Sequence, residues 1–210
     1  MKKLNLILII SLILNLFVIG NVMATENTKT EKPVSFTQDI SNLPSLAPNE
    51  KVLVNPGETK AFKISKDGIT YILEICPKIP QTTNDIASSA TTGTGYAYCG
   101  INLYSDVGIL LGTTNLQQSW NYSNGQCTYL PSPIMTDSVP WYSYPNYWQS
   151  YGVSGPTPNG SGQYVSQGVD KLFNGIPTPY GGWYFQACTC TMQLTIDGYG
   201  HWGQWTYYHW

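Results

Sequence analysis

The stretch ETKAFKISKDGITYILEIC, Glu58–Cys76, decides the fold class because apolar and polar residues alternate on both sides of a short turn. Phe62 and Ile64 share one face of the first half. Asp67-Gly68 then supplies a turn that can adopt positive φ. The apolar residues on one side of the returning half are Tyr71, Leu73 and Ile75. The pattern predicts a β-hairpin.

Two later segments alternate in the same way and predict two more strands. The first runs over residues 96–104, and the second is ACTCTMQLTID, 187–197. The inward face of the second segment is expected to carry Cys188, Cys190, Met192, Leu194 and Ile196. HWGQWTYYHW, 201–210, is expected to return as the last strand.

One segment has helical spacing instead. Val165, Val169, Leu172 and Phe173 recur at intervals typical of a helix face, and Asn174-Gly175 would end it. Many short strands with turn clusters and at most one short helix predict an all-β fold, an antiparallel β-sandwich of jelly-roll or immunoglobulin-like type.

The N-terminus predicts export. Lys2 and Lys3 precede an apolar run, and residues 21–24 offer small side chains before Thr25, which is the layout of a signal peptide over residues 1–24. A retained membrane anchor is the alternative. Residues 25–45 are then expected to be a flexible lead-in and 46–210 a single β-rich domain, in a secreted or periplasmic protein.

Charge is scarce in the later chain. Arginine is absent, and beyond Lys78 the charged residues are Asp85, Asp106, Asp137, Asp170, Lys171 and Asp197. A surface so poor in cations cannot hold a phosphate backbone, so nucleic acid is not an expected partner. No pair of carboxylates, nucleophile elbow or phosphate-binding loop indicates an enzyme.

The chain has five cysteines, and export favours disulfides. Cys76 and Cys99 lie on neighbouring predicted strands and are expected to form one bridge. Cys127 is expected to pair with Cys188 or Cys190, which leaves the other thiol buried. A zinc site from these last two cysteines with His201 and His209 is the alternative, but the spacing is not that of a structural zinc site. We therefore expect no metal and no cofactor.

Two short motifs nevertheless point to an enzyme. GQCTY, 125–129, and GYGHW, 198–202, resemble the nucleophile and histidine motifs of the CHAP-type cysteine amidases and endopeptidases that cut peptidoglycan. The resemblance implies Cys127 as nucleophile and His201 as base. Pro131 and Pro133 follow where that family has a helix, and for this reason a disulfide or buried thiol is preferred.

Aromatic residues crowd the last third of the chain, with six of the seven tryptophans and ten of the sixteen tyrosines from position 141 onward. VPWYSYPNYWQSYG, 139–152, is interrupted by Pro140 and Pro145 and is expected to be a loop. About half of its rings should be buried in a core, and the rest should stay partly exposed to solvent. The candidate ligand-binding residues are Trp141, Tyr142, Tyr144, Tyr147, Trp148 and Tyr151.

Exposed rings can stack on sugars, which predicts a secreted, non-catalytic domain that recognises a glycan or cell-surface component. The same segment resembles the aromatic lipid-binding loop of actinoporin-like pore-formers, so insertion at a membrane interface is an alternative. Packing within a surface assembly is another, and the cysteine peptidoglycan hydrolase is the last.

Overall fold

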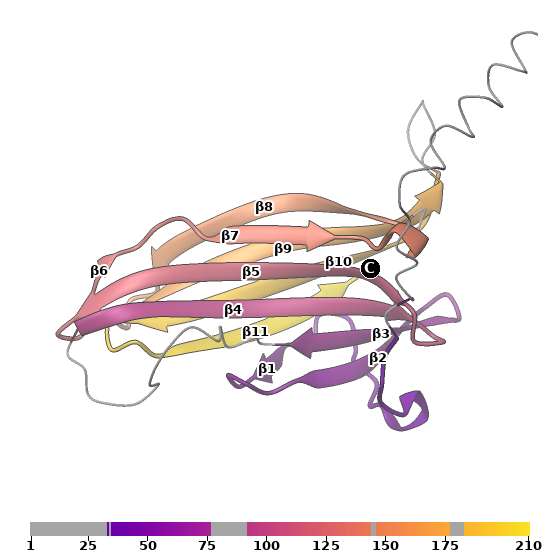
Figure 1. Ribbon diagram of the computed structural model, residues 1–210, viewed down its shortest axis with the longest axis horizontal. Helices are drawn as coiled ribbons and strands as arrows, with labels where there is room; N and C mark the ends of the chain where they lie inside the picture. The colour runs from indigo at the N-terminus through magenta and orange to yellow at the C-terminus, as the bar shows by residue number, and fades with distance from the viewer. Residues whose placement is uncertain (1–32, 34, 77–91, 144–145, 177–182) are drawn as a thin grey trace, which may run out of the picture. The chain divides into compact units, whose positions relative to one another are not determined.

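The computed structural model describes residues 33, 35–76, 92–143, 146–176 and 183–210 (Figure 1). The predicted signal peptide lies outside these residues. Within the described part of the predicted lead-in, Ile40–Asn42 form a 3-10 helix, η1, capped by the side chain of Asp39. Phe36, Ile40 and Leu43 pack against a small cluster of buried side chains, so residues 35–45 contact the β-rich part of the chain. No helix in the described residues is long and apolar enough to cross a membrane.

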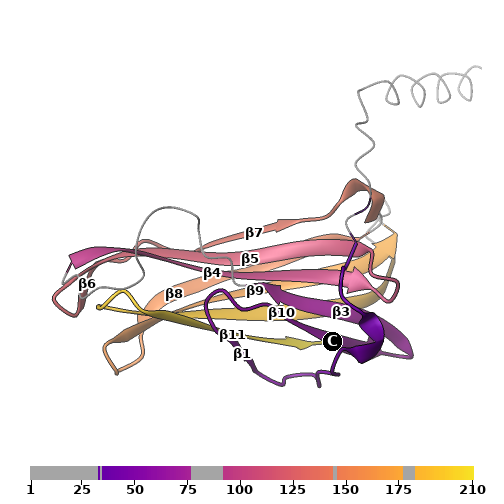
Figure 2. The ribbon, with the colours of Figure 1, turned by 60° about the horizontal axis from the view of Figure 1, so that its bottom comes forward.

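The described residues form two antiparallel sheets packed together, which confirms the predicted all-β sandwich (Figures 1 and 2). The five-stranded sheet has the order β1-β11-β10-β9-β8, and the other has the order β2-β3-β4-β5-β6 with β7 paired to β5. The strands are β1 (Val52–Val54), β2 (Lys60–Lys66), β3 (Ile69–Cys76), β4 (Thr92–Ser105), β5 (Leu110–Ser123), β6 (Gln126–Tyr129), β7 (Ile134–Ser138), β8 (Tyr147–Pro158), β9 (Gln163–Ile176), β10 (Trp183–Asp197) and β11 (Trp202–His209).

The hairpin predicted at residues 58–76 is confirmed as β2 and β3, which pair from Lys60 opposite Ile75 to Lys66 opposite Ile69. Asp67 and Gly68 form its turn with φ of 52° and 80°, the left-handed region that such a turn requires. Alternation then buries the inward residues Ile64, Tyr71, Leu73 and Ile75. The strand predicted from alternation at 96–104 is also present, within β4.

The core lies between the long central strands of the two sheets, where β4 and β5 run alongside β9 and β10 (Figures 1 and 2). The residues of β10 that face this core are those that the alternating pattern predicts. Side-chain hydrogen bonds also link the sheets. Trp120 Nε1 donates to the backbone oxygen of Asp197 at 3.0 Å, and Ser166 Oγ donates to Gln118 Oε1 at 2.7 Å. Such bonds fix how one sheet lies on the other because each buried donor needs its partner.

The helix predicted around Val165–Phe173 is wrong, because these residues belong to β9. The inward positions of this strand are Ser166, Gly168, Asp170 and Leu172, all buried. Three of the four are polar or lack a side chain. The period-two signal is therefore hidden, and the apolar residues that remain happen to follow helical spacing.

The predicted disulfides are also wrong, because Cys99, Cys127, Cys188 and Cys190 are free thiols. The register pairs Cys76 with Gly100 instead of Cys99. Cys99 is buried, with its sulfur 3.4 Å from Thr206 Oγ1 of the other sheet. Cys188 and Cys190 point into the core from β10 with their sulfurs 4.0 Å apart, while Cys127 packs at the margin of the core.

The aromatic segment 139–152 is a loop only in part. Trp141–Ser143 form a 3-10 helix, η2, and β8 begins at Tyr147, two residues after Pro145. Tyr147, Trp148 and Tyr151 therefore belong to a strand at the edge of the five-stranded sheet. Proline is tolerated on an edge strand, and β8 itself contains Pro156, so the prolines did not justify a loop over the whole segment.

Candidate functional site

The surface of interest is the outer face of the five-stranded sheet, meaning the side of β8–β11 that points away from the core. On β10, Cys190, Met192 and Leu194 face the core, so the alternate residues lie on the outer face. These outer residues of β10 are Thr189, Thr191, Gln193 and Thr195. They stand directly opposite His209, Tyr207, Trp205 and Gly203 of β11, in that order.

Three rings follow one another along the outer face of β11, and we call Trp205, Tyr207 and His209 the ring row. The Trp205 and Tyr207 centroids are 5.5 Å apart with an interplanar angle of 18°, and those of Tyr207 and His209 are 6.4 Å apart at 27°. Near-parallel rings at these separations overlap only in part, as in an offset stack. Each ring is partly exposed, so the row presents a continuous aromatic strip.

The threonines beside this strip are covered. Thr191 is only 1% exposed although it lies on the outer face. Its neighbours there are Tyr207 on β11 and Val169 on β9. Thr189, between His209 and Lys171, is also buried. These threonines are therefore not accessible to a ligand, whereas the rings of the ring row are partly exposed.

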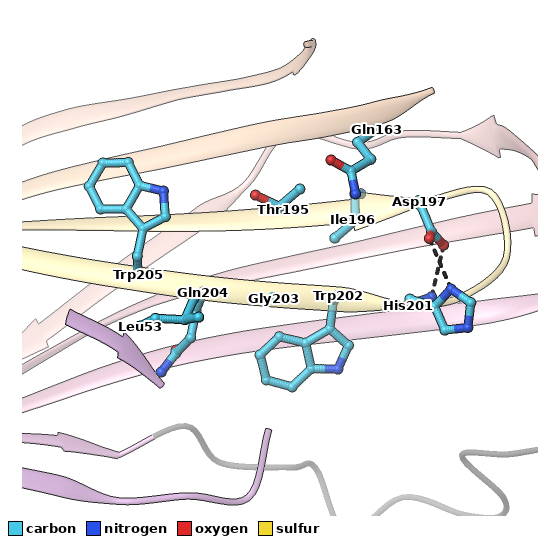
Figure 3. A pocket seen from close by; sticks show the side chains of 10 residues that line it. All are labelled: Leu53, Gln163, Thr195, Ile196, Asp197, His201, Trp202, Gly203, Gln204 and Trp205. Atoms are coloured by element: carbon cyan, nitrogen blue, oxygen red, sulfur yellow. Dashed lines mark hydrogen bonds and ion pairs between the residues drawn. The ribbon is translucent and has the colours of Figure 1, made fainter. Parts of the chain in front are cut away.

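The ring row ends in a pocket of about 320 Å³ next to Trp205 (Figure 3). Two residues before Trp205 stands Gly203, where an added Cβ would have no atom within 4 Å. The missing side chain thus leaves open space on the outer face beside the last ring. The residues that line the pocket are Leu53, Gln163, Thr195, Ile196, Asp197, His201, Trp202, Gly203, Gln204 and Trp205.

The polar end of the pocket is built by the turn between β10 and β11. Asp197 Oδ1 accepts hydrogen bonds from the backbone N–H groups of Tyr199 and His201, both at 2.9 Å. Asp197 Oδ2 lies 2.9 Å from Nδ1 of His201 (Figure 3). The carboxylate therefore orients the imidazole, whose side chain is 78% exposed and leaves Nε2 available to a ligand. Gln163 adds an amide, held by Asn159.

The site residues predicted from the sequence differ in their exposure in the structure. Trp141 is 67% exposed and contacts Tyr142 edge to face. Trp148 is buried, and its Nε1 donates to the backbone oxygen of Ser138, so it is a core residue. Tyr144 lies outside the described residues.

The two remaining rings of that segment lie beside the outer face. Tyr147 stacks on Phe173 at 5.1 Å and 11°, opposite it in the register of β8 and β9. Tyr151 is exposed, with Lys171 Nζ 6.0 Å from its ring centroid. The outer face is therefore flanked by the ring row on β11 and by these rings on β8 and β9.

Cys127 lacks the lowered pKa that a nucleophilic cysteine needs. It packs against the core, and burial raises the pKa of its thiol, with the charge of Asp197 raising it further. Burial also raises the pKa of Cys99, to about 12.

The outer face carries little charge. Among the described residues of β8–β11, the aspartates, glutamates and lysines are Asp170, which is buried on the inner face, together with Lys171 and Asp197. Lys51, which precedes β1, lies with its Nζ 4.4 Å from the Trp205 ring centroid. No group of three or more His, Cys, Asp or Glu side chains in the described part of the chain is arranged to hold a metal ion.

The ring row was within reach of sequence reasoning. Trp205, Tyr207 and His209 alternate with Gln204, Thr206 and Tyr208 in a segment that was predicted as a strand. They lie on one face because successive side chains of a strand point to opposite sides. The sequence did not show which of the two faces meets the core, because each face of this strand carries aromatic rings.

Comparison of the chain with protein families, curated proteins and solved structures finds no match.

Proposed function

We propose that this protein is a secreted, non-catalytic binding protein that recognises a neutral glycan on the outer face of its five-stranded sheet. The observation that carries the proposal is the ring row ending at the pocket beside Gly203. The apolar face of a sugar ring packs on an aromatic ring, while hydroxyl groups need hydrogen-bond partners when they leave water. For the first requirement the site offers the part of the Trp205 ring that Tyr207 and Lys51 leave exposed. For the second it offers Gln163, Asp197 and His201.

The charge balance supports a neutral ligand. Asp197 next to the pocket disfavours a sugar acid or phosphate, and the scarcity of cations gives an anion nothing to hold it. A volume of about 320 Å³ is at the lower end of the range for small-molecule pockets, about 300–1,000 Å³. It suits one sugar unit with water around it.

The proposal moves the site from the 141–151 segment to β11. Trp148 cannot contribute while it is buried, and Trp141 is exposed on η2, outside the strands that form the outer face. Tyr147 and Tyr151 stay close to the proposed site through Phe173 and Lys171. Export itself stays a prediction from residues 1–24.

A glycan array with neutral and acidic glycans tests the proposal. We expect binding to neutral glycans only, with affinity lowered at least tenfold, about 1.4 kcal/mol, in Trp205→Ala because the stacking surface is lost. Gly203→Leu should abolish binding, since the leucine would occupy the open space beside Trp205. Its melting temperature should match the wild type, because the added Cβ meets no atom.

Trp141→Ala is the comparison, since it removes a tryptophan that is more exposed than Trp205 but lies on η2. Unchanged binding in Trp141→Ala with loss in Trp205→Ala locates the site on β11. The reverse result would return it to the 141–151 segment. Binding to neutral liposomes with no glycan recognised would instead favour the membrane alternative.

A further inference from the structure

On the outer face, an aromatic ring recurs at every second residue of β11 from Trp205 to His209. From this repeat we infer that the ligand is a linear neutral polysaccharide lying along β11. The inference rests on the proposed function and extends it from a sugar to a chain of sugars. One terminal or internal unit occupies the pocket beside Gly203, and the following units lie over Trp205, Tyr207 and His209. A repeating surface is what a repeating ligand can use at several positions at once.

The first step is the spacing of the rings. Trp205, Tyr207 and His209 recur every second residue on one face, so a new ring appears about every 6.8 Å, twice the strand rise of ~3.4 Å. From Gly203 to His209 the row extends over about 20 Å. A single sugar in the pocket would leave Tyr207 and His209 without a role.

The second step is the continuity of the surface. The centroid separations of 5.5 and 6.4 Å leave no gap between rings. Because Thr189 and Thr191 are buried, neither side chain of β10 interrupts the surface beside the rings. Gln193 lies opposite Trp205 and is partly exposed, so an amide is available where the row meets the pocket.

The third step is the electrostatic character of the row. Lys51 lies over the Trp205 ring, and no carboxylate of the described β8–β11 residues lies on the outer face between Asp197 and His209. Among the described residues, Lys51 is therefore the one charged side chain that a neutral chain would meet at the ring row. An extended acidic polymer would find only Lys51 and Lys171 over its whole length, too few contacts for strong binding.

The test is calorimetric titration with ladders of neutral glucose, mannose and N-acetylglucosamine oligomers, from the monosaccharide to the hexasaccharide. We expect affinity to rise with length. In Tyr207→Ala the affinity for the hexasaccharide should fall about tenfold or more, while binding of the monosaccharide changes less than about twofold. His209→Ala, at the far end of the row, should reduce affinity only for the longest ligands.

Tyr129→Ala is the control, because it removes an exposed tyrosine from β6 in the other sheet. It should leave every affinity unchanged. Equal affinity for the monosaccharide and the hexasaccharide would overturn the inference and leave the proposed function in place. Absence of binding to any neutral glycan would overturn both. Loss of monosaccharide binding in Tyr207→Ala would also contradict it, because Tyr207 does not line the pocket.

Discussion

At the scale of single residues, the inner face of β9 carries an unusual group. Asp170 has no exposed surface, and its Oδ2 atom has no hydrogen-bond partner. Burial raises the pKa of the Asp170 carboxyl, and the charge of Asp137 adds to the rise, while Thr114 and the N–H of Lys171 partly oppose it. Folding therefore shifts the carboxyl towards its protonated form relative to the unfolded chain.

The raised pKa of Asp170 predicts that the free energy of unfolding depends on pH. The unfolded carboxyl has a pKa near 3.9, so the folded state binds the proton more tightly, and stability falls as the pH rises from that value through the raised pKa. Asp170→Asn removes the titration, and we expect it to be more stable than the wild type at pH 7. Each unit of pKa elevation corresponds to about 1.4 kcal/mol. Denaturant titrations between pH 4.5 and 7.5 measure the difference.

Asp137→Asn is the control for this effect, since it removes a neighbouring charge from an exposed position without changing the buried group. It should retain a weaker pH dependence of the same sign. If Asp170→Asn were less stable than the wild type at pH 7, the carboxylate would have to be the favoured form, and the account of Asp170 would be wrong.

At the scale of elements, the contact between β4 and β5 depends on a glycine. Gly95 stands directly opposite Trp120, and a Cβ at Gly95 would overlap the Trp120 indole. The same indole is buried and donates across the sandwich to the backbone of Asp197. Glycine therefore makes room for the side chain that joins β5 to the end of β10.

We expect Gly95→Ala to lower the free energy of unfolding by about 1–3 kcal/mol, because the methyl group forces Trp120 from a well-packed position. Gly203→Ala is the matched control: it changes the same residue type in a strand where the Cβ meets no atom, and it should change stability by less than about 0.5 kcal/mol. Equal effects of the two substitutions in chemical denaturation would show that backbone preference, and not the Trp120 contact, is decisive.

Element by element, sequence reasoning succeeded where one face of a strand is apolar. β2, β3, β4 and the second half of β10 have this property, and alternation located them. It failed at β9, whose inward residues include Ser166 and Asp170, because a polar inward face cannot be told from an outward one by composition. It also misplaced β8, where Pro145 lies close to the first residue of the strand.

At the scale of the whole molecule, the class of fold followed from the sequence, but the site did not. Alternation indicates which residues share a face, whereas the packing of two sheets decides which face meets the other sheet. Trp205 and Trp210 are both partly exposed, yet Trp205 belongs to the ring row while Trp210 packs on Tyr71 and Tyr208. Proximity of Asp197 and His201 to the row also depends on the β10–β11 register.

The cysteines lead to a prediction for the whole molecule. Four of the five have free thiols, so the sandwich is stabilised by its core and not by cross-links in the unfolded chain. We expect the melting temperature to be the same with and without a reducing agent. Thiol titration should count five free cysteines after denaturation without reductant, and few in the native protein, because Cys99, Cys188 and Cys190 are buried.

The two sheets bury a large apolar surface between their long central strands, and this burial stabilises the sandwich without cross-links. The control is Cys99→Ser, which should destabilise the protein equally with and without reductant, since it places a more polar group in the buried core and breaks no covalent bond. A fall in melting temperature of several degrees on adding reductant to the wild type, together with fewer than five titratable thiols, would show that a disulfide forms and that the thiol assignments are wrong.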